Sequence, residues 1–227
     1  MKALAIDSAS SCITFTAINE KKTASLSLNI GMHQSENLIP GIEEVMKKTG
    51  LKPETLEFAC TALGPGSFTG LRLSFSALKA FQLAYSIPLY GIPSLEANAY
   101  PWSFFSGAVL SIIDAKKNRF YAQVFRNGQA CSEIEDTETE NVLSLVDIEE
   151  NVLVCGAPLD VTLFVEQAKS FRPTQHFTVV NGISHSSTFS LLELGQSKYL
   201  KKEKGFPEYE GPLYIRKSEA ELNLINS

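Results

Sequence analysis

A glycine-rich string is the strongest candidate for chemistry in this sequence. It reads Gly64-Pro65-Gly66-Ser67-Phe68-Thr69-Gly70-Leu71-Arg72 and lies between a predicted strand and a predicted helix. Glycine permits tight turns and close approach of the backbone, and the exposed amides at a helix start can hold an anion. The same glycines would also suit a strand-to-helix turn without a ligand, so the loop by itself leaves both interpretations open.

The residues that could bind a metal or act as nucleophiles are scattered. The three histidines, His33, His176 and His185, share no metal-ligand spacing. Ser8 and Ser67 have no evident histidine partner, so nothing indicates an activated serine. The cysteines lie far apart without a C-x-x-C pair, which favours reduced thiols over a zinc site or a disulfide framework; they are Cys12, Cys60, Cys131 and Cys155.

The composition is typical of a globular protein that does not bind nucleic acid on its own. The 227 residues are 44% hydrophobic and 20% charged, which fits one large or two small domains. A formal charge of −5 argues against a chain that binds a phosphate backbone unaided, because that needs clustered Lys and Arg. The acidic run from Glu133 to Glu150 is interpreted as a solvated face. No signal peptide or membrane span is recognised, so we expect a cytoplasmic protein.

Hydrophobic periodicity predicts the elements that position the glycine-rich string. The predicted strands of the first half are Ala3–Ile6, Ile13–Ala17, Ala24–Leu28, Phe58–Leu63 and Leu89–Ile92. A helix is predicted before Gly50 from an apolar stripe with helical spacing, made of Leu38, Ile39, Ile42, Val45 and Met46. A second helix, Leu71–Tyr85, is apolar almost all round, which indicates burial on more than one side.

A weaker second half begins near Ala108. Its predicted strands are Val109–Asp114, Phe120–Phe125, Ala130–Ile134, Val152–Cys155 and Phe177–Val180, and helices are predicted after Pro158 and through Leu191–Tyr199. The first half is predicted to contain, in order, three strands, a helix, a strand, a helix and a strand. This is the order of a ribonuclease-H-like unit, which the actin, Hsp70 and sugar-kinase superfamily duplicates. We therefore expect an α/β fold of two ribonuclease-H-like halves, with residues 1–106 complete and residues 107–227 reduced.

Taken as a whole, the string Gly64–Arg72 closely resembles the signature of the TsaB (YeaZ) family, a paralogue of the TsaD family. Other stretches agree with this resemblance, namely Ala5–Ala9, His33–Pro40, Asp114–Lys117 and Pro212–Arg216. The similarity spans almost the whole chain and is dense up to about Phe125. It implies a role in making threonylcarbamoyladenosine on tRNA.

The resemblance also implies that the chain is not the catalyst. TsaD carries a helix with His-x-x-x-His, whose two histidines share one face and bind a metal. In register, Ser94 and Asn98 stand at these positions, and neither is a competent ligand for a transition metal. We expect no catalytic residue and no metal in this chain. A metallopeptidase, as in older glycoprotease descriptions of the wider family, stays open as an alternative.

Actin-like folds place a carboxylate at the end of the first strand, close to the metal and phosphates of a nucleotide. Asp7 occupies this position, and with Gly64, Gly66 and Gly70 it forms a candidate, vestigial cofactor-binding site. The second phosphate loop of such folds should be rich in glycine, yet here it reads Asp114-Ala115-Lys116-Lys117. We expect no resident cofactor and weak or no ATP binding. An ATP-dependent small-molecule kinase of the same superfamily is the main alternative.

TsaB-like proteins pair with the catalytic paralogue, or with themselves, through the two helices of the first domain. The predicted interface residues are Leu38, Ile42, Val45, Leu71, Phe75 and Leu78. We expect a scaffold that docks a TsaD-like subunit for threonylcarbamoyl transfer to the adenosine beside the anticodon. A TsaE-like ATPase joins the complex, a homodimer is a further form, and tRNA is contacted only through the complex. If Ile42 and Val45 face outward, Ile42→Glu or Val45→Glu should leave a folded chain that no longer associates.

Overall fold

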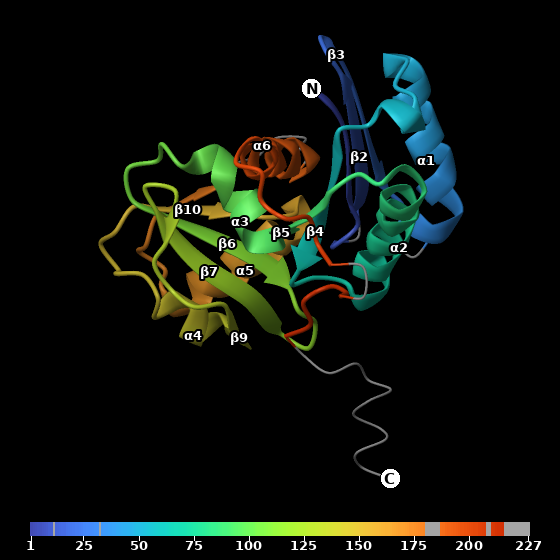
Figure 1. Ribbon diagram of the computed structural model, residues 1–227. Helices are drawn as coiled ribbons and strands as arrows, with labels where there is room; N and C mark the ends of the chain where they lie inside the picture. The colour runs from blue at the N-terminus through green and yellow to red at the C-terminus, as the bar shows by residue number, and fades with distance from the viewer. Residues whose placement is uncertain (11, 32, 180–186, 208–209, 216–227) are drawn as a thin grey trace.

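The computed structural model describes residues 1–10, 12–31, 33–179, 187–207 and 210–215, which form two lobes, each built on one sheet (Figure 1). The first sheet has the strand order β3-β2-β1-β4-β5, and the second has the order β11-β10-β6-β7-β8 with β9 paired to β7. An antiparallel meander extended by parallel strands is the ribonuclease-H-like arrangement. The predicted α/β fold class is therefore confirmed.

The first lobe carries helices on both faces of its sheet. Its strands are β1 (Lys2–Asp7), β2 (Cys12–Asn19), β3 (Lys22–Asn29), β4 (Phe58–Gly64) and β5 (Leu89–Pro93). Helices α1 (Gln34–Thr49) and α2 (Phe68–Tyr85) cover one face, and α6 (Ser187–Leu200) covers the other (Figure 1). The short helices η1 (Pro53–Thr55), α3 (Ser94–Ala99) and η2 (Tyr100–Trp102) lie in the connections.

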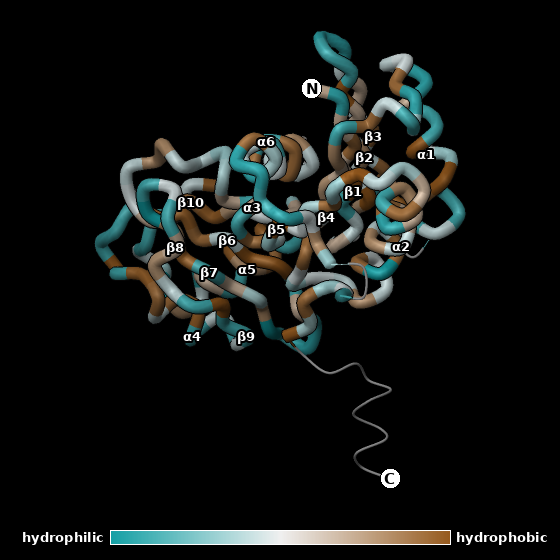
Figure 2. Tube along the Cα trace, viewed as in Figure 1, coloured by the Kyte–Doolittle hydropathy of each residue, from teal (hydrophilic) through white to brown (hydrophobic). Residues whose placement is uncertain are grey.

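The second lobe is smaller. Its strands are β6 (Ala108–Asp114), β7 (Arg119–Arg126), β8 (Gln129–Ala130), β9 (Glu135–Glu138), β10 (Val152–Cys155) and β11 (Phe177–Val179), with helices α4 (Thr139–Leu143) and α5 (Pro158–Phe171). Figure 2 shows hydrophobic residues concentrated along the central strands and hydrophilic residues at the β2–β3 turn. No helix in the described ranges is both long and apolar enough to cross a membrane.

The predicted strands and helices of the first half are confirmed, and their ends have local causes. Helix α1 runs through Pro40 and stops at Gly50, whose left-handed φ of 67° ends the helix as predicted. Helix α2 begins earlier than the predicted Leu71. The Ser67 side chain accepts a hydrogen bond from the Gly70 amide and caps the helix, which therefore starts at Phe68.

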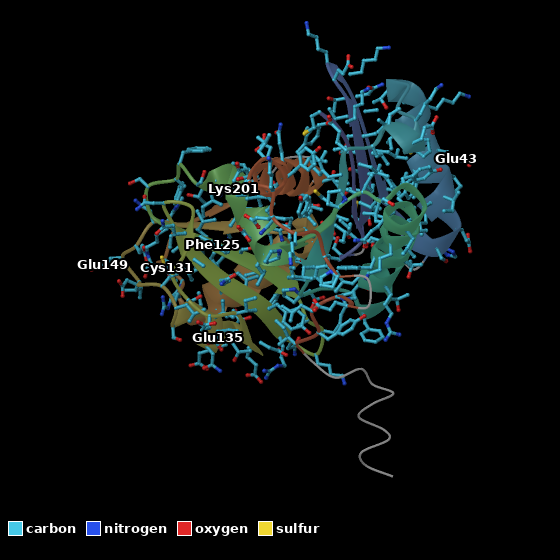
Figure 3. All side chains as sticks on the ribbon, viewed as in Figure 1. Glu43, Phe125, Cys131, Glu135, Glu149 and Lys201 are labelled. Carbon is cyan, nitrogen blue, oxygen red and sulfur yellow. The ribbon has the colours of Figure 1, made fainter. Side chains whose placement is uncertain are left out.

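The second half departs from prediction at the acidic run. Of the predicted strand Ala130–Ile134, only Ala130 lies in a strand, the two-residue β8, and a separate strand, β9, consists of three acidic residues and Thr137. Arg119 donates from Nε to Asp136 Oδ1 at 3.0 Å, so β9 pairs with β7 despite its charge. Other carboxyl groups of the run, Glu135 and Glu149, lie at the periphery of this lobe (Figure 3). Val180, included in the prediction for β11, lies outside the described residues.

Helix α6 returns to the first sheet. Leu191 and Leu192 pack with Ala3, Phe58 and Cys60 in one buried cluster. The proposed boundary at residues 106 and 107 thus separates the two sheets, while α6 belongs to the first lobe by packing.

Gly195 sets how closely α6 approaches the sheet. A Cβ at this position would overlap the Sγ of buried Cys60. We expect Gly195→Ala to lower the free energy of unfolding by about 1–3 kcal/mol through overpacking, even though alanine is intrinsically the better helix former. Denaturant unfolding measures this loss.

Two further variants make the Gly195 test specific. Cys60→Ala removes the overlapping sulfur, so the double variant should regain most of the stability that Gly195→Ala loses. Gly211→Ala serves as the control, because nothing lies within 4 Å of its added Cβ. A Gly195→Ala protein as stable as the wild type would contradict the close packing of α6.

Candidate functional site

The glycine-rich string packs against the loop that follows β1. A Cβ on Gly66 would lie 2.6 Å from the carbonyl oxygen of Ala9, and one on Gly70 would overlap the carbonyl oxygen of Ser8. Ser8 Oγ also donates to the Gly70 carbonyl at 2.6 Å. These two glycines are therefore required for a backbone-to-backbone contact between the start of α2 and the end of β1.

Several amides of this loop are already used within the chain. Ser67 N–H donates to the Ala9 carbonyl at 2.6 Å, and Leu71 N–H donates to the Ser67 carbonyl at 2.8 Å. Gly70 N–H donates to Ser67 Oγ at 3.2 Å. A phosphate that used the Ser67 or Gly70 amide would have to displace these partners. The interpretation of the string as a structural turn thus has direct support in its hydrogen bonds.

Asp7 joins β1 to α6. Its Oδ1 accepts from the Ala9 amide at 2.8 Å, and its Oδ2 accepts from the hydroxyl of Ser187, the first residue of α6. Burial raises the pKa of Asp7 above its ordinary value, while both hydrogen bonds act in the opposite direction. The structure therefore gives the carboxyl group a role in holding α6 on the first sheet.

The second candidate phosphate loop is the turn between β6 and β7. Lys116 and Lys117 have φ values of 62° and 57°, so the turn is left-handed without glycine. Lys116 Nζ lies 2.6 Å from Asp114 Oδ2, and Asp160 Oδ2 accepts from the Asp114 amide at 3.0 Å. Asp114 thus offsets the charge of Lys116, and burial raises the pKa of Asp160.

Ser94 and Asn98, which the resemblance is expected to place at the paralogue's metal-ligand positions, lie on α3. Ser94 begins this helix and is buried, and its Oγ has no hydrogen-bond partner among the described residues. Asn98 stands four residues later and is half-buried. Within the described ranges, no three His, Cys, Asp or Glu side chains are grouped so that they could hold a metal ion.

The remaining candidate side chains do not come together. His33 is exposed beside Glu36, with Nδ1 3.5 Å from Oε1, and His176 is exposed on the second lobe. His185 lies outside the described residues. Cys60 and Cys155 are buried, and burial raises the pKa of both thiols.

The six residues predicted for the partner interface lie in the protein core. Ile42 is 4% exposed, Val45 1% and Phe75 3%, and the other three are buried as well. The predicted interface of Leu38, Ile42, Val45, Leu71, Phe75 and Leu78 is therefore covered within this chain, and the condition that Ile42 and Val45 face outward is not met. Helical periodicity shows that a helix has an apolar stripe but not what the stripe packs against. The stripes of α1 and α2 both pack against the sheet of their own lobe. Ile42→Glu and Val45→Glu should unfold the chain.

The surface that α2 offers is a different and narrower stripe, which we call the outer face of α2. It consists of exposed residues at helical spacing, namely Arg72, Ser76, Ala80, Leu83 and Ala84. Leu83 is 60% exposed, and Ile39 of neighbouring α1 is 55% exposed. Arg72 is the only charged residue among the exposed residues of α2. The sequence indicates such a face, because α2 is apolar almost all round. Which of its residues are exposed is known only from the structure.

Comparisons with known proteins cover nearly the whole chain. The model of the family described as TsaD, tRNA N6-adenosine threonylcarbamoyltransferase, matches residues 30–223. A Bacillus subtilis protein named tRNA threonylcarbamoyladenosine biosynthesis protein TsaB is 26% identical over 238 residues, covering 100% of this chain and 99% of that protein. The Escherichia coli protein of the same name is 25% identical over 141 residues, 61% of each chain.

Two solved structures share the fold. One is a Pseudomonas aeruginosa protein described as similar to peptidase YEAZ, with a TM-score of 0.77 at 18% identity over 95% of this chain and 99% of that one. The other is YeaZ from Pseudomonas aeruginosa, with a TM-score of 0.75 at 18% identity over 94% and 99% of the two chains. At this level of identity the likeness establishes the architecture.

The raised pKa of Asp7 predicts a pH-dependent stability. Because the folded pKa lies above the unfolded one, folding favours the protonated form, and this contribution is lost as pH rises through the folded pKa. Asp7→Asn keeps an acceptor for the Ala9 amide and removes the charge. We expect the wild type to lose stability relative to Asp7→Asn as pH rises from about 4 to about 8.

Melting temperatures of both proteins across this range test the prediction for Asp7. Glu43→Gln, at an exposed carboxyl group on the outer side of α1 (Figure 3), controls for general charge effects. A difference between wild type and Asp7→Asn that does not change with pH would contradict the prediction.

ATP should bind the isolated chain weakly or not at all. In the glycine-rich loop the Ser67 amide already donates to the Ala9 carbonyl. In the turn between β6 and β7, the Asp114 amide already donates to the Asp160 carboxyl group. Titration calorimetry with ATP and Mg²⁺ measures this binding. A micromolar or tighter dissociation constant would contradict the expectation and favour the kinase alternative.

Proposed function

This chain belongs to the TsaD-type family, on its TsaB (YeaZ) branch, and from that premise we propose that it is the non-catalytic scaffold subunit for tRNA threonylcarbamoyladenosine synthesis. In this role it docks a TsaD-type catalytic subunit, which transfers the threonylcarbamoyl group to the adenosine beside the anticodon. A TsaE-type ATPase joins the assembled complex.

The observation that carries the proposal is the full-length match to the Bacillus subtilis protein named for this biosynthesis, which covers 99% of that protein. Both lobes of this chain thus correspond to parts of the relative. A supporting role is favoured by Ser94 and Asn98, which by the predicted register take the places of the catalytic paralogue's histidines and are poor ligands for a transition metal. The packed glycine-rich loop supports it as well, because its amides hold the fold together.

The outer face of α2 is the docking surface that we propose. Its small residues, Ser76, Ala80 and Ala84, let a second helix approach closely, and Leu83 offers an exposed apolar anchor. Protein interfaces have apolar cores that are depleted in charge, and a few central residues dominate their affinity. A homodimer would use the same face and would compete with the catalytic subunit.

The charge of the chain favours indirect contact with tRNA. A net charge of −5 opposes the approach of a phosphate backbone. Lys198 Nζ, in the last turn of α6, lies 3.1 Å from Glu203 Oε2, so this lysine is already paired within the chain. The catalytic subunit then supplies the main surface for the RNA.

Reconstitution tests the division of labour. The chain alone, given tRNA and threonylcarbamoyl adenylate, should form no product, and product should appear only when the catalytic subunit and the ATPase are present. Incorporation of labelled threonine into tRNA measures this. Turnover by the pure chain at a rate that the catalytic subunit does not change would overturn the scaffold function.

A charge on the outer face of α2 should abolish docking without unfolding the chain. We expect Leu83→Glu to weaken binding to the catalytic subunit at least about a hundredfold, because an unpaired charge would be buried at the interface. Its circular dichroism and melting temperature should match the wild type, since Leu83 is 60% exposed.

The matched control lies on the second lobe. Leu159 of α5 is 65% exposed, so Leu159→Glu makes the same change at a comparable site. We expect it to leave binding to the catalytic subunit unaltered. Equal affinities for Leu83→Glu and the wild type would place the interface elsewhere.

A further inference from the structure

The chain after α6 crosses back over the first lobe. We call residues 203–207 and 210–215 the strap. Phe206 N–H donates to the Leu89 carbonyl at 2.6 Å, and Leu213 N–H donates to the Leu63 carbonyl at 2.8 Å. These bonds attach the strap to β5 and to β4, so it follows one flank of α2.

The strap reaches Arg72 through Tyr214. Arg72 Nε donates to the Tyr214 hydroxyl at 3.1 Å. The guanidinium carbon lies 4.0 Å from the Phe68 ring centroid and 5.7 Å from that of Tyr214. The two ring centroids are 4.6 Å apart. Cation–π attraction and one hydrogen bond therefore order a side chain that would otherwise sample many rotamers.

This arrangement leaves the outer end of the guanidinium available. Arg72 is exposed, and within the described ranges no carboxylate forms an ion pair with it. A guanidinium fork binds a carboxylate or a phosphate through two parallel hydrogen bonds. A fork that is ordered before binding loses less entropy when the ligand arrives.

We propose that the strap presents Arg72 as a preordered anchor for a carboxylate of the docked catalytic subunit. The inference rests on the proposed function and adds the polar contact that fixes the register of docking. The strap thereby becomes part of the interface, although it is distant from α2 in the sequence.

The surroundings of Arg72 favour a protein carboxylate over an RNA phosphate. Along the outer face of α2, the residues that follow Arg72 are uncharged, beginning with Ser76 and Ala80. Surfaces that bind nucleic acid cluster Lys and Arg, whereas an arginine beside apolar and aromatic groups is typical of an anchor in protein interfaces. The negative charge of the whole chain points the same way.

Three variants test the anchor by their affinity for the catalytic subunit. Arg72→Ala should weaken binding at least about tenfold, as expected for one charge-assisted pair. Arg72→Lys keeps the charge but lacks the fork, so it should recover only part of the affinity. Tyr214→Phe keeps the ring and removes the acceptor for Nε, and it should weaken binding severalfold. Circular dichroism verifies that each variant is folded.

Arg126→Lys is the matched control. Arg126 forms a forked pair with Glu150 on the second lobe, with both hydrogen bonds at 2.8 Å. This variant should bind the catalytic subunit as the wild type does. In the isolated chain, the Nε–H nuclear magnetic resonance signal of Arg72 should exchange slowly with water, and Tyr214→Phe should speed that exchange.

The outcomes separate the inference from the function on which it rests. A wild-type chain that fails to bind the catalytic subunit overturns both. A wild type that binds, with all three variants binding equally well, overturns the arginine anchor and leaves docking intact. If Arg72→Ala lowers only the affinity of the assembled complex for tRNA, the arginine binds a phosphate and the carboxylate assignment is wrong.

Discussion

The contact between the glycine-rich loop and the loop after β1 is the constraint on which the first lobe depends. Because Gly66 and Gly70 have no Cβ, the start of α2 can rest on the backbone of Ser8 and Ala9. This fixes the axis of α2, so that one stripe reaches the sheet and the opposite stripe faces outward. The same contact uses the Ser67 amide, which donates to the Ala9 carbonyl. The glycine-rich motif therefore holds the start of α2 against the loop after β1.

The two faces of the first sheet are stabilised by parts of the chain that are far apart. Helices α1 and α2 cover one face, and α6 arrives from the end of the second lobe to cover the other (Figure 1). Polar contacts fix α6 in place, since Asp7 accepts from Ser187 and the hydroxyls of Thr16 and Thr188 lie 2.7 Å apart in the interior. The strap then closes the flank of α2. The proposed docking face is thus supported from behind by the first sheet and at its edge by the strap.

Sequence reasoning recovered the elements of the first half, because continuous apolar runs such as Ala3–Ile6 have few other interpretations. It could not decide what an apolar helical stripe packs against, because burial on the chain's own sheet and burial against a partner give the same spacing. A helical stripe such as that of Ile42 and Val45 looks alike whether it covers its own sheet or a partner, and the structure shows the former. It also missed β9, because the pairing of Asp136 with Arg119 across two strands leaves no local signal. The hydrogen bond between Arg72 and Tyr214 joins residues 142 positions apart, which only the fold brings together.

Amide hydrogen exchange of this chain, with and without the TsaD-type catalytic subunit, tests the docking claim most directly. Docking through the outer face of α2 and the strap predicts slower exchange in both on complex formation, with exchange in α5 unchanged. Slower exchange confined to the second lobe, or none at all in a complex that demonstrably forms, would contradict it.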